Sequence, residues 1–124
     1  MEETDVTTQM GYENYPKALG GAIRRAWKST GGIPILVTEN GIATAIDEKR
    51  IGFMDTALRE VQACIAEGID VRSYLHWSLL DNFEWAFGYA PTFGLVAVDH
   101  ATFARHPKPS AAWLGQVARA RALP

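Results

Sequence analysis

The chain has 124 residues, of which 48% are hydrophobic and 21% are charged, with a formal net charge of −2. This composition is typical of a folded globular protein and excludes a largely disordered chain. With no basic excess, we expect neither nucleic acid nor a membrane as a partner. No segment reaches the roughly 18 consecutive apolar residues of a membrane span, and the N-terminus does not resemble a signal peptide, so we expect a cytoplasmic protein.

The first predicted elements are a helix and a strand. Residues 1–9 show no periodicity and predict a loose tail before a folded region over residues 10–124. Ile33–Thr38 is a short, nearly continuous apolar run, which is typical of a strand buried on both faces of a parallel sheet. Before it, large apolar residues at a spacing of four predict an amphipathic helix that ends at Gly31–Gly32: Tyr15, Leu19, Ile23 and Trp27.

A second helix and a second strand follow. Val71–Trp77 is the second predicted strand, and an aromatic, acidic loop over residues 78–89 comes after it. A short extended segment, 93–98, then precedes a last helix that begins at Pro109. The second helix ends at Gly68 and is predicted by apolar residues at spacings of three and four: Ile51, Met54, Leu58, Val61 and Ile65.

Strands joined by a helix-length crossover indicate parallel pairing. Two apolar strands cannot cover themselves, so we expect this chain to be part of a larger fold or to associate. The chain is also well below the length of about 250 residues of a complete eight-stranded α/β barrel. Four apolar residues are expected to face the interior of such a barrel: Ile35, Val37, Val71 and Leu75.

Glu39 comes directly after the first strand, where α/β folds collect their active sites at the carboxyl ends of parallel strands. Strict alternation puts its side chain on the same face as Ile35 and Val37. An acid at a strand end is also a common helix cap or solvated loop residue. The position alone therefore leaves both interpretations open.

The second strand ends at Trp77, and Glu84 and Trp85 lie in the loop beyond it. Indole rings stack on the apolar faces of sugars, while carboxylates bind sugar hydroxyls, so these residues suit a carbohydrate site. A buried aromatic cluster is the alternative. Because both strand ends lie on one rim, the combination with Glu39 favours a binding site.

These motifs are specific when taken together. Val37–Gly41 reads Val-Thr-Glu-Asn-Gly, and some 35 residues on Tyr74–Trp85 reads Tyr-Leu-His-Trp-Ser-Leu-Leu-Asp-Asn-Phe-Glu-Trp. The pair resembles family 1 glycoside hydrolases, the β-glucosidases and β-galactosidases. The resemblance covers nearly the whole chain, including Gln9–Glu13, Phe93–Val96 and Pro109–Trp113.

The resemblance implies the C-terminal portion of a (β/α)8 TIM barrel: helix 6, strand 7, helix 7, strand 8 and helix 8. It implies that Glu39 is the catalytic nucleophile of a retaining β-glycosidase. It further implies a cis peptide between Trp77 and Ser78 within an intact or faithfully reassembled barrel, and we expect a relaxed trans peptide if the chain folds on its own with the loop rearranged. The substrate-binding positions that it implies are Trp77, Glu84, Trp85 and Phe93.

The second carboxyl group of such an enzyme is missing from this sequence. Family members carry the acid/base glutamate in an Asn-Glu-Pro segment, which these 124 residues lack. We therefore expect the isolated chain to be inactive without the N-terminal part of the barrel. The expected partners are a β-glucoside or related small saccharide and the N-terminal remainder of the barrel or other copies of the chain. A non-catalytic sugar-binding or self-assembling module is the alternative. We expect no cofactor and no metal, and His76 is interpreted as a packing residue.

Overall fold

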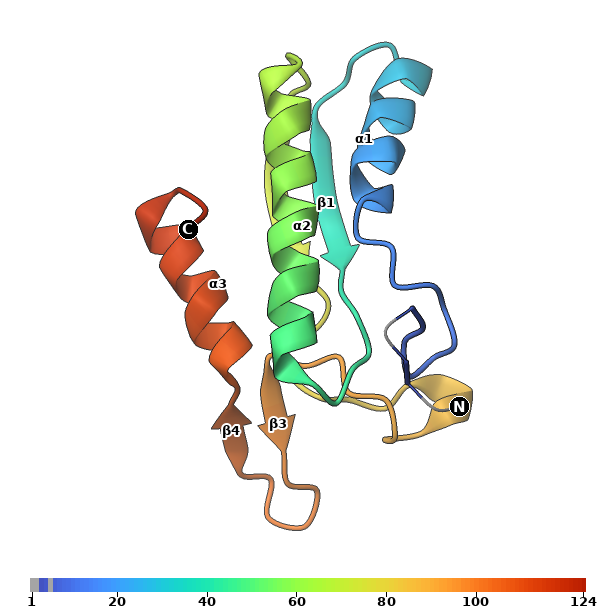
Figure 1. Ribbon diagram of the computed structural model, residues 1–124, viewed down its shortest axis with the longest axis vertical. Helices are drawn as coiled ribbons and strands as arrows, with labels where there is room; N and C mark the ends of the chain where they lie inside the picture. The colour runs from blue at the N-terminus through green and yellow to red at the C-terminus, as the bar shows by residue number, and fades with distance from the viewer. Residues whose placement is uncertain (1–2, 5) are drawn as a thin grey trace.

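The structure, a computed structural model that describes residues 3–4 and 6–124, is built on two parallel strands (Figure 1). These are β1 (Ile35–Asn40) and β2 (Val71–His76), joined by the long helix α2 (Asp47–Ala66). Helix α1 (Ala18–Ser29) precedes β1 and packs beside α2. The predicted parallel pairing through a helical crossover is confirmed.

The second half of the chain forms a hairpin and a helix. A short 3-10 helix, η1 (Trp85–Phe87), lies within the aromatic loop. Strands β3 (Val96–Val98) and β4 (Arg105–Pro107) pair in antiparallel fashion and lead into helix α3 (Pro109–Ala120). Strand β4 was not predicted, because its residues are exposed and have no apolar pattern.

The two faces of the β1–β2 sheet differ in what covers them. Helices α1 and α2 cover the helix face, where the buried cluster of Ile23, Val37 and Cys64 lies. The open face carries Leu36 and Leu75, which are 58% and 55% exposed. The expectation that Ile35, Val37 and Val71 face a barrel interior was wrong: all three pack in or against the cluster on the helix face. Of the four residues, Leu75 alone lies on the open face.

The N-terminal segment that was expected to be loose contacts the rest of the chain in its described part; residues 1, 2 and 5 lie outside the described residues. The backbone N–H of Ala45 donates to Glu3 at 3.1 Å, and that of Thr92 donates to the Gln9 side chain at 2.9 Å. Thr8 is buried. These described residues therefore brace the loops that follow β1 and precede β3.

The exposed apolar open face leads to a first prediction. In sedimentation velocity, the isolated chain is expected to show a sedimentation coefficient that rises with concentration, because association buries Leu36 and Leu75. Replacing both leucines with lysine should reduce this dependence, whereas Ile65→Lys, a matched change on the exposed surface of α2, should not. A concentration-independent monomer of the unsubstituted chain would contradict the prediction.

Candidate active site

Glu39 lies at the carboxyl end of β1 in an irregular register. Val37 pairs with Tyr74 and Asn40 pairs with His76, so Thr38 and Glu39 together lie opposite Leu75. This is the arrangement of a β-bulge, which adds one residue and reverses which face the next side chains occupy. Asn40 lies on the helix face beside Tyr74, so its exposed neighbour Glu39 lies on the open face. The alternation that grouped Glu39 with Val37 was therefore wrong.

The ends of the two strands are joined directly after Glu39. The Trp77 backbone N–H donates to the Asn40 carbonyl oxygen at 2.9 Å. Gly41 lies so close to the next peptide that a Cβ there would be 1.7 Å from the Trp77 carbonyl oxygen. The Trp77–Ser78 peptide is cis, the geometry that was expected for an intact barrel and not the trans geometry expected for a rearranged loop. The carboxylate of Glu39 and the indole of Trp77 thus come from adjoining strand ends.

The loop that carries Glu84 and Trp85 is fastened at its base. Asp81 accepts hydrogen bonds from the Gly94 N–H at 2.7 Å and from Lys108 Nζ at 3.0 Å, and Lys108 also donates to the Gly94 carbonyl oxygen. Glu84 is half-buried, whereas Trp85 is 82% exposed. The exposed indole is available to contact a ligand.

Phe93 has a different environment from the other predicted site residues. Its backbone carbonyl accepts a hydrogen bond from the Ser78 N–H at 3.3 Å, next to Trp77. Phe93 lines a hollow of about 230 Å³ together with Asn40 and Gly41. Neither Trp77 nor Trp85 lines that hollow. The contact between Phe93 and the Trp77 region is therefore the backbone hydrogen bond from Ser78.

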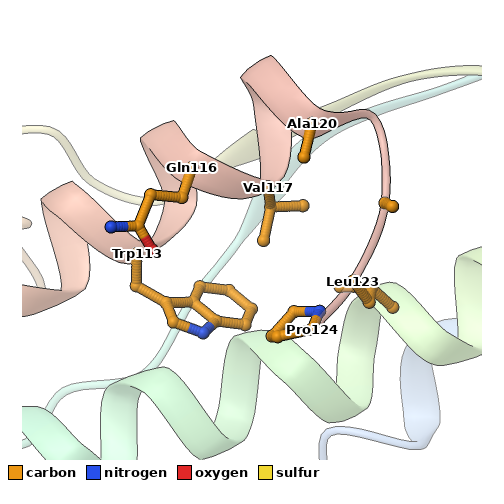
Figure 2. Close-up of a pocket in the computed structure, with 7 residues that line it drawn as sticks. Trp113, Gln116, Val117, Ala120, Leu123 and Pro124 are labelled. Atoms are coloured by element: carbon orange, nitrogen blue, oxygen red, sulfur yellow. The ribbon is translucent and has the colours of Figure 1, made fainter.

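A second hollow, of about 250 Å³, lies between α3 and the C-terminal residues, above α2 (Figure 2). Figure 2 shows the indole of Trp113 and the side chain of Val117 pointing into it, with Leu123 and Pro124 on the opposite side. None of the predicted site residues lines this hollow. It is therefore separate from the candidate active site.

A buried arginine supports the loops around the site. Arg50, on α2, donates to the carbonyl oxygens of Thr44 at 2.6 Å and Thr92 at 2.7 Å, and it pairs with Asp47. Ser110, at the start of α3, also donates to Asp47. Burial raises the pKa of Asp47, but the hydrogen bonds from Ser110 and Arg50 together lower it by a larger amount. The net pKa of Asp47 therefore lies below the ordinary value.

Burial also shifts the pKa of two β2 side chains on the helix face. It raises the pKa of Tyr74 well above the ordinary tyrosine value, so this hydroxyl keeps its proton. It lowers the pKa of His76 from 6.5 to about 4, which keeps the imidazole neutral. The neutral, partly buried imidazole agrees with the interpretation of His76 as a packing residue.

The lowered pKa of His76 predicts a pH dependence of stability. Unfolded chains bind a proton at this histidine near pH 6.5, while the folded chain does so only near pH 4, so falling pH favours unfolding across that window. We expect the free energy of unfolding to fall by about 2 to 3 kcal/mol between these limits through His76. Urea unfolding followed by circular dichroism measures it. His76→Leu should flatten the profile and the exposed control His106→Gln should not; equal slopes for all three chains contradict the prediction.

The fold and the site together define a class of protein. A parallel strand–helix–strand unit places a carboxylate and an indole at adjoining carboxyl strand ends, as α/β-barrel enzymes do. Within the described residues, no three His, Cys, Asp or Glu side chains gather in a group that could hold a metal ion.

The sequence profile of glycosyl hydrolase family 1 matches residues 1–123, and the chain belongs to that family. A β-galactosidase of Sulfolobus acidocaldarius is 37% identical over 118 residues, which cover 95% of this chain and 24% of that relative. A bifunctional β-D-glucosidase/β-D-fucosidase of Bifidobacterium breve is 40% identical over 119 residues, covering 86% of this chain and 26% of the relative. The chain thus spans about a quarter of the length of these curated relatives.

Solved structures of the family have the same fold over this stretch. The apo structure of a β-glucosidase designated 1317 is 58% identical, with a TM-score of 0.90, and the match covers 95% of this chain and 29% of that one. The family 1 β-glucosidase of Thermotoga maritima is 32% identical, with a TM-score of 0.92, and the match covers 99% of this chain and 30% of that one.

None of the helices in the described part of the chain is both long and apolar enough to cross a bilayer.

Proposed function

We propose that this chain supplies the nucleophile side of a retaining β-glycosidase site that hydrolyses terminal β-D-glycosides. Glu39 attacks the anomeric carbon and forms a glycosyl ester as the aglycone oxygen leaves. A second carboxyl group, from a part of the barrel outside this sequence, protonates that oxygen and then activates the water that hydrolyses the ester. Trp77, Glu84, Trp85 and Phe93 hold the sugar.

One observation carries this proposal: the hydrogen bond from the Trp77 N–H to the Asn40 carbonyl oxygen, at 2.9 Å, which brings the neighbour of Glu39 against the sugar-stacking residue. A nucleophile and an aromatic platform on adjoining strand ends suit a pyranose ring, whose apolar face stacks on an indole. Complexes of the Thermotoga maritima enzyme with cyclophellitol and isofagomine lactam support the assignment to this class of ligand.

Within the barrel, we place α1 as helix 6, β1 as strand 7, α2 as helix 7, β2 as strand 8 and α3 as helix 8. The open face then lines the barrel interior, which explains why Leu36 and Leu75 are exposed in this chain alone. The partners of the chain are a β-glucoside and the remainder of the barrel, or other copies of the chain. The exposed open face also suits a second candidate function, a non-catalytic module that binds sugar or assembles with itself.

The experiment compares the chain alone with a chimera, defined here as β-glucosidase 1317 with its matching segment replaced by this chain. The chimera should hydrolyse an aryl β-glucoside, whereas the chain alone should not exceed its own Glu39→Gln variant, since both carboxyl groups must be positioned for turnover. Turnover by the chain alone that disappears in Glu39→Gln would show that this chain holds both groups. A folded chimera that binds a glucoside but does not hydrolyse it would favour the non-catalytic module.

A further inference from the structure

Tyr74 makes a contact that the sequence motifs do not assign to any role. Its hydroxyl donates a hydrogen bond to the side-chain oxygen of Asn40 at 3.0 Å. The ring packs against the cluster of Val37, Val61 and Cys64 on the helix face, so the hydroxyl is held in a fixed place. Because burial also keeps this hydroxyl protonated, it remains a donor across the ordinary pH range.

Asn40 is where the bulged end of β1 meets β2. Its backbone oxygen accepts the Trp77 N–H on one side, and its side chain accepts the Tyr74 hydroxyl on the other. These two contacts fix both the register of Asn40 relative to β2 and the face of the sheet that its side chain occupies. Asn40 is paired with His76 in this register, which leaves Thr38 and Glu39 opposite Leu75.

The orientation of Glu39 depends on that register. If the end of β1 returned to regular pairing, the side-chain alternation would shift by one residue and would turn Glu39 toward the helix face. Its carboxylate would then lie away from Trp77. A side-chain contact that favours the bulged register therefore favours the only orientation in which Glu39 reaches the open face.

We propose that Tyr74 and Asn40 are positioning residues: their hydrogen bond holds the bulged end of β1 so that Glu39 points from the open face beside Trp77. This inference rests on the proposed function. Tyr74 acts through Asn40, on the face opposite the site. Loss of the contact leaves the sugar-binding loop in place but lets the nucleophile vary in position, which slows attack more than it weakens binding.

The test uses the chimera with Tyr74→Phe, Asn40→Ala and the double variant. Ser29→Ala is the control, because it removes a hydroxyl from an exposed residue at the C-terminal end of α1, away from the carboxyl ends of the strands. With an aryl β-glucoside, we expect each single variant to lower kcat per titrated active site about tenfold and to change KM by less than about twofold. The double variant should have about the same kcat as the single variants, because each of the two changes removes the same contact.

The outcomes separate this inference from the proposed function. Retention of kcat within about twofold in Tyr74→Phe, or multiplicative losses in the double variant, would overturn the positioning role. A change confined to KM would overturn it as well. If Asn40→Ala does not fold, Tyr74→Phe decides alone, because it removes a single oxygen atom. Activity that survives Glu39→Gln would instead reject the proposed function, whatever the Tyr74 variants do.

Discussion

In the chimera, Glu39→Gln is expected to lower kcat for an aryl β-glucoside by about 10³-fold or more. The amide has nearly the same shape as the carboxylate but is too weak a nucleophile to form the glycosyl ester. Because it leaves Trp77 and the sugar-binding loop unchanged, affinity for a non-hydrolysable glucoside should change little.

The matched control is Glu48→Gln, which removes the same charge from an exposed position in the first turn of α2. It should keep kcat within about twofold, since surface changes away from a site usually have small effects. Near-normal turnover by the Glu39 variant, measured at saturating substrate, would show that another group attacks the anomeric carbon.

Gly41→Ala is expected to destabilise the chain by about 3 kcal/mol or more. The added Cβ would lie 1.7 Å from the Trp77 carbonyl oxygen and 2.8 Å from the Trp77 carbonyl carbon. Both atoms belong to the backbone, so the clash cannot be relieved by turning a side chain. The end of β2 must move, and kcat/KM of the chimera should fall with it because Trp77 moves too.

Gly52→Ala provides the control in urea unfolding of the chain. Gly52 lies within α2, and a Cβ there has no atom within 4 Å, so alanine should stabilise the helix by about 0.5 to 1 kcal/mol. Equal free energies of unfolding for the two variants would mean that the Trp77 backbone does not lie against Gly41. The difference between the variants therefore reports the close approach of the two strand ends.

The order of the main elements could be predicted because each leaves a local pattern. Apolar spacing revealed α2, and the glycine stop of α1 is confirmed by the positive φ of Gly31 and Gly32, 71° and 91°. The strand runs are almost wholly apolar, so they predicted burial but not which face packs against the helices. That ambiguity explains why Ile35 and Val37 were assigned to the wrong face.

The face on which the Glu39 side chain lies could not be predicted from the two-residue alternation of side chains along a strand. The extra residue at Thr38–Glu39 is defined only by pairing with β2, some 35 residues away, and the sequence of β1 carries no mark of it. The Tyr74–Asn40 contact was missed for the same reason. One feature of the sequence did indicate that the two strand ends lie close together. Asn40 and Gly41 follow Glu39, and a glycine in or next to a strand often marks the close approach of another backbone.

The most direct test of the central claim is to trap the covalent intermediate in the chimera. Incubation with 2,4-dinitrophenyl 2-deoxy-2-fluoro-β-D-glucoside, followed by proteolysis and mass spectrometry, identifies the residue that becomes glycosylated. The account predicts one fluoroglucosyl group per active site, bound as an ester to Glu39. A label on Glu84 or on any other residue, or complete inactivation with Glu39 unmodified, would contradict it.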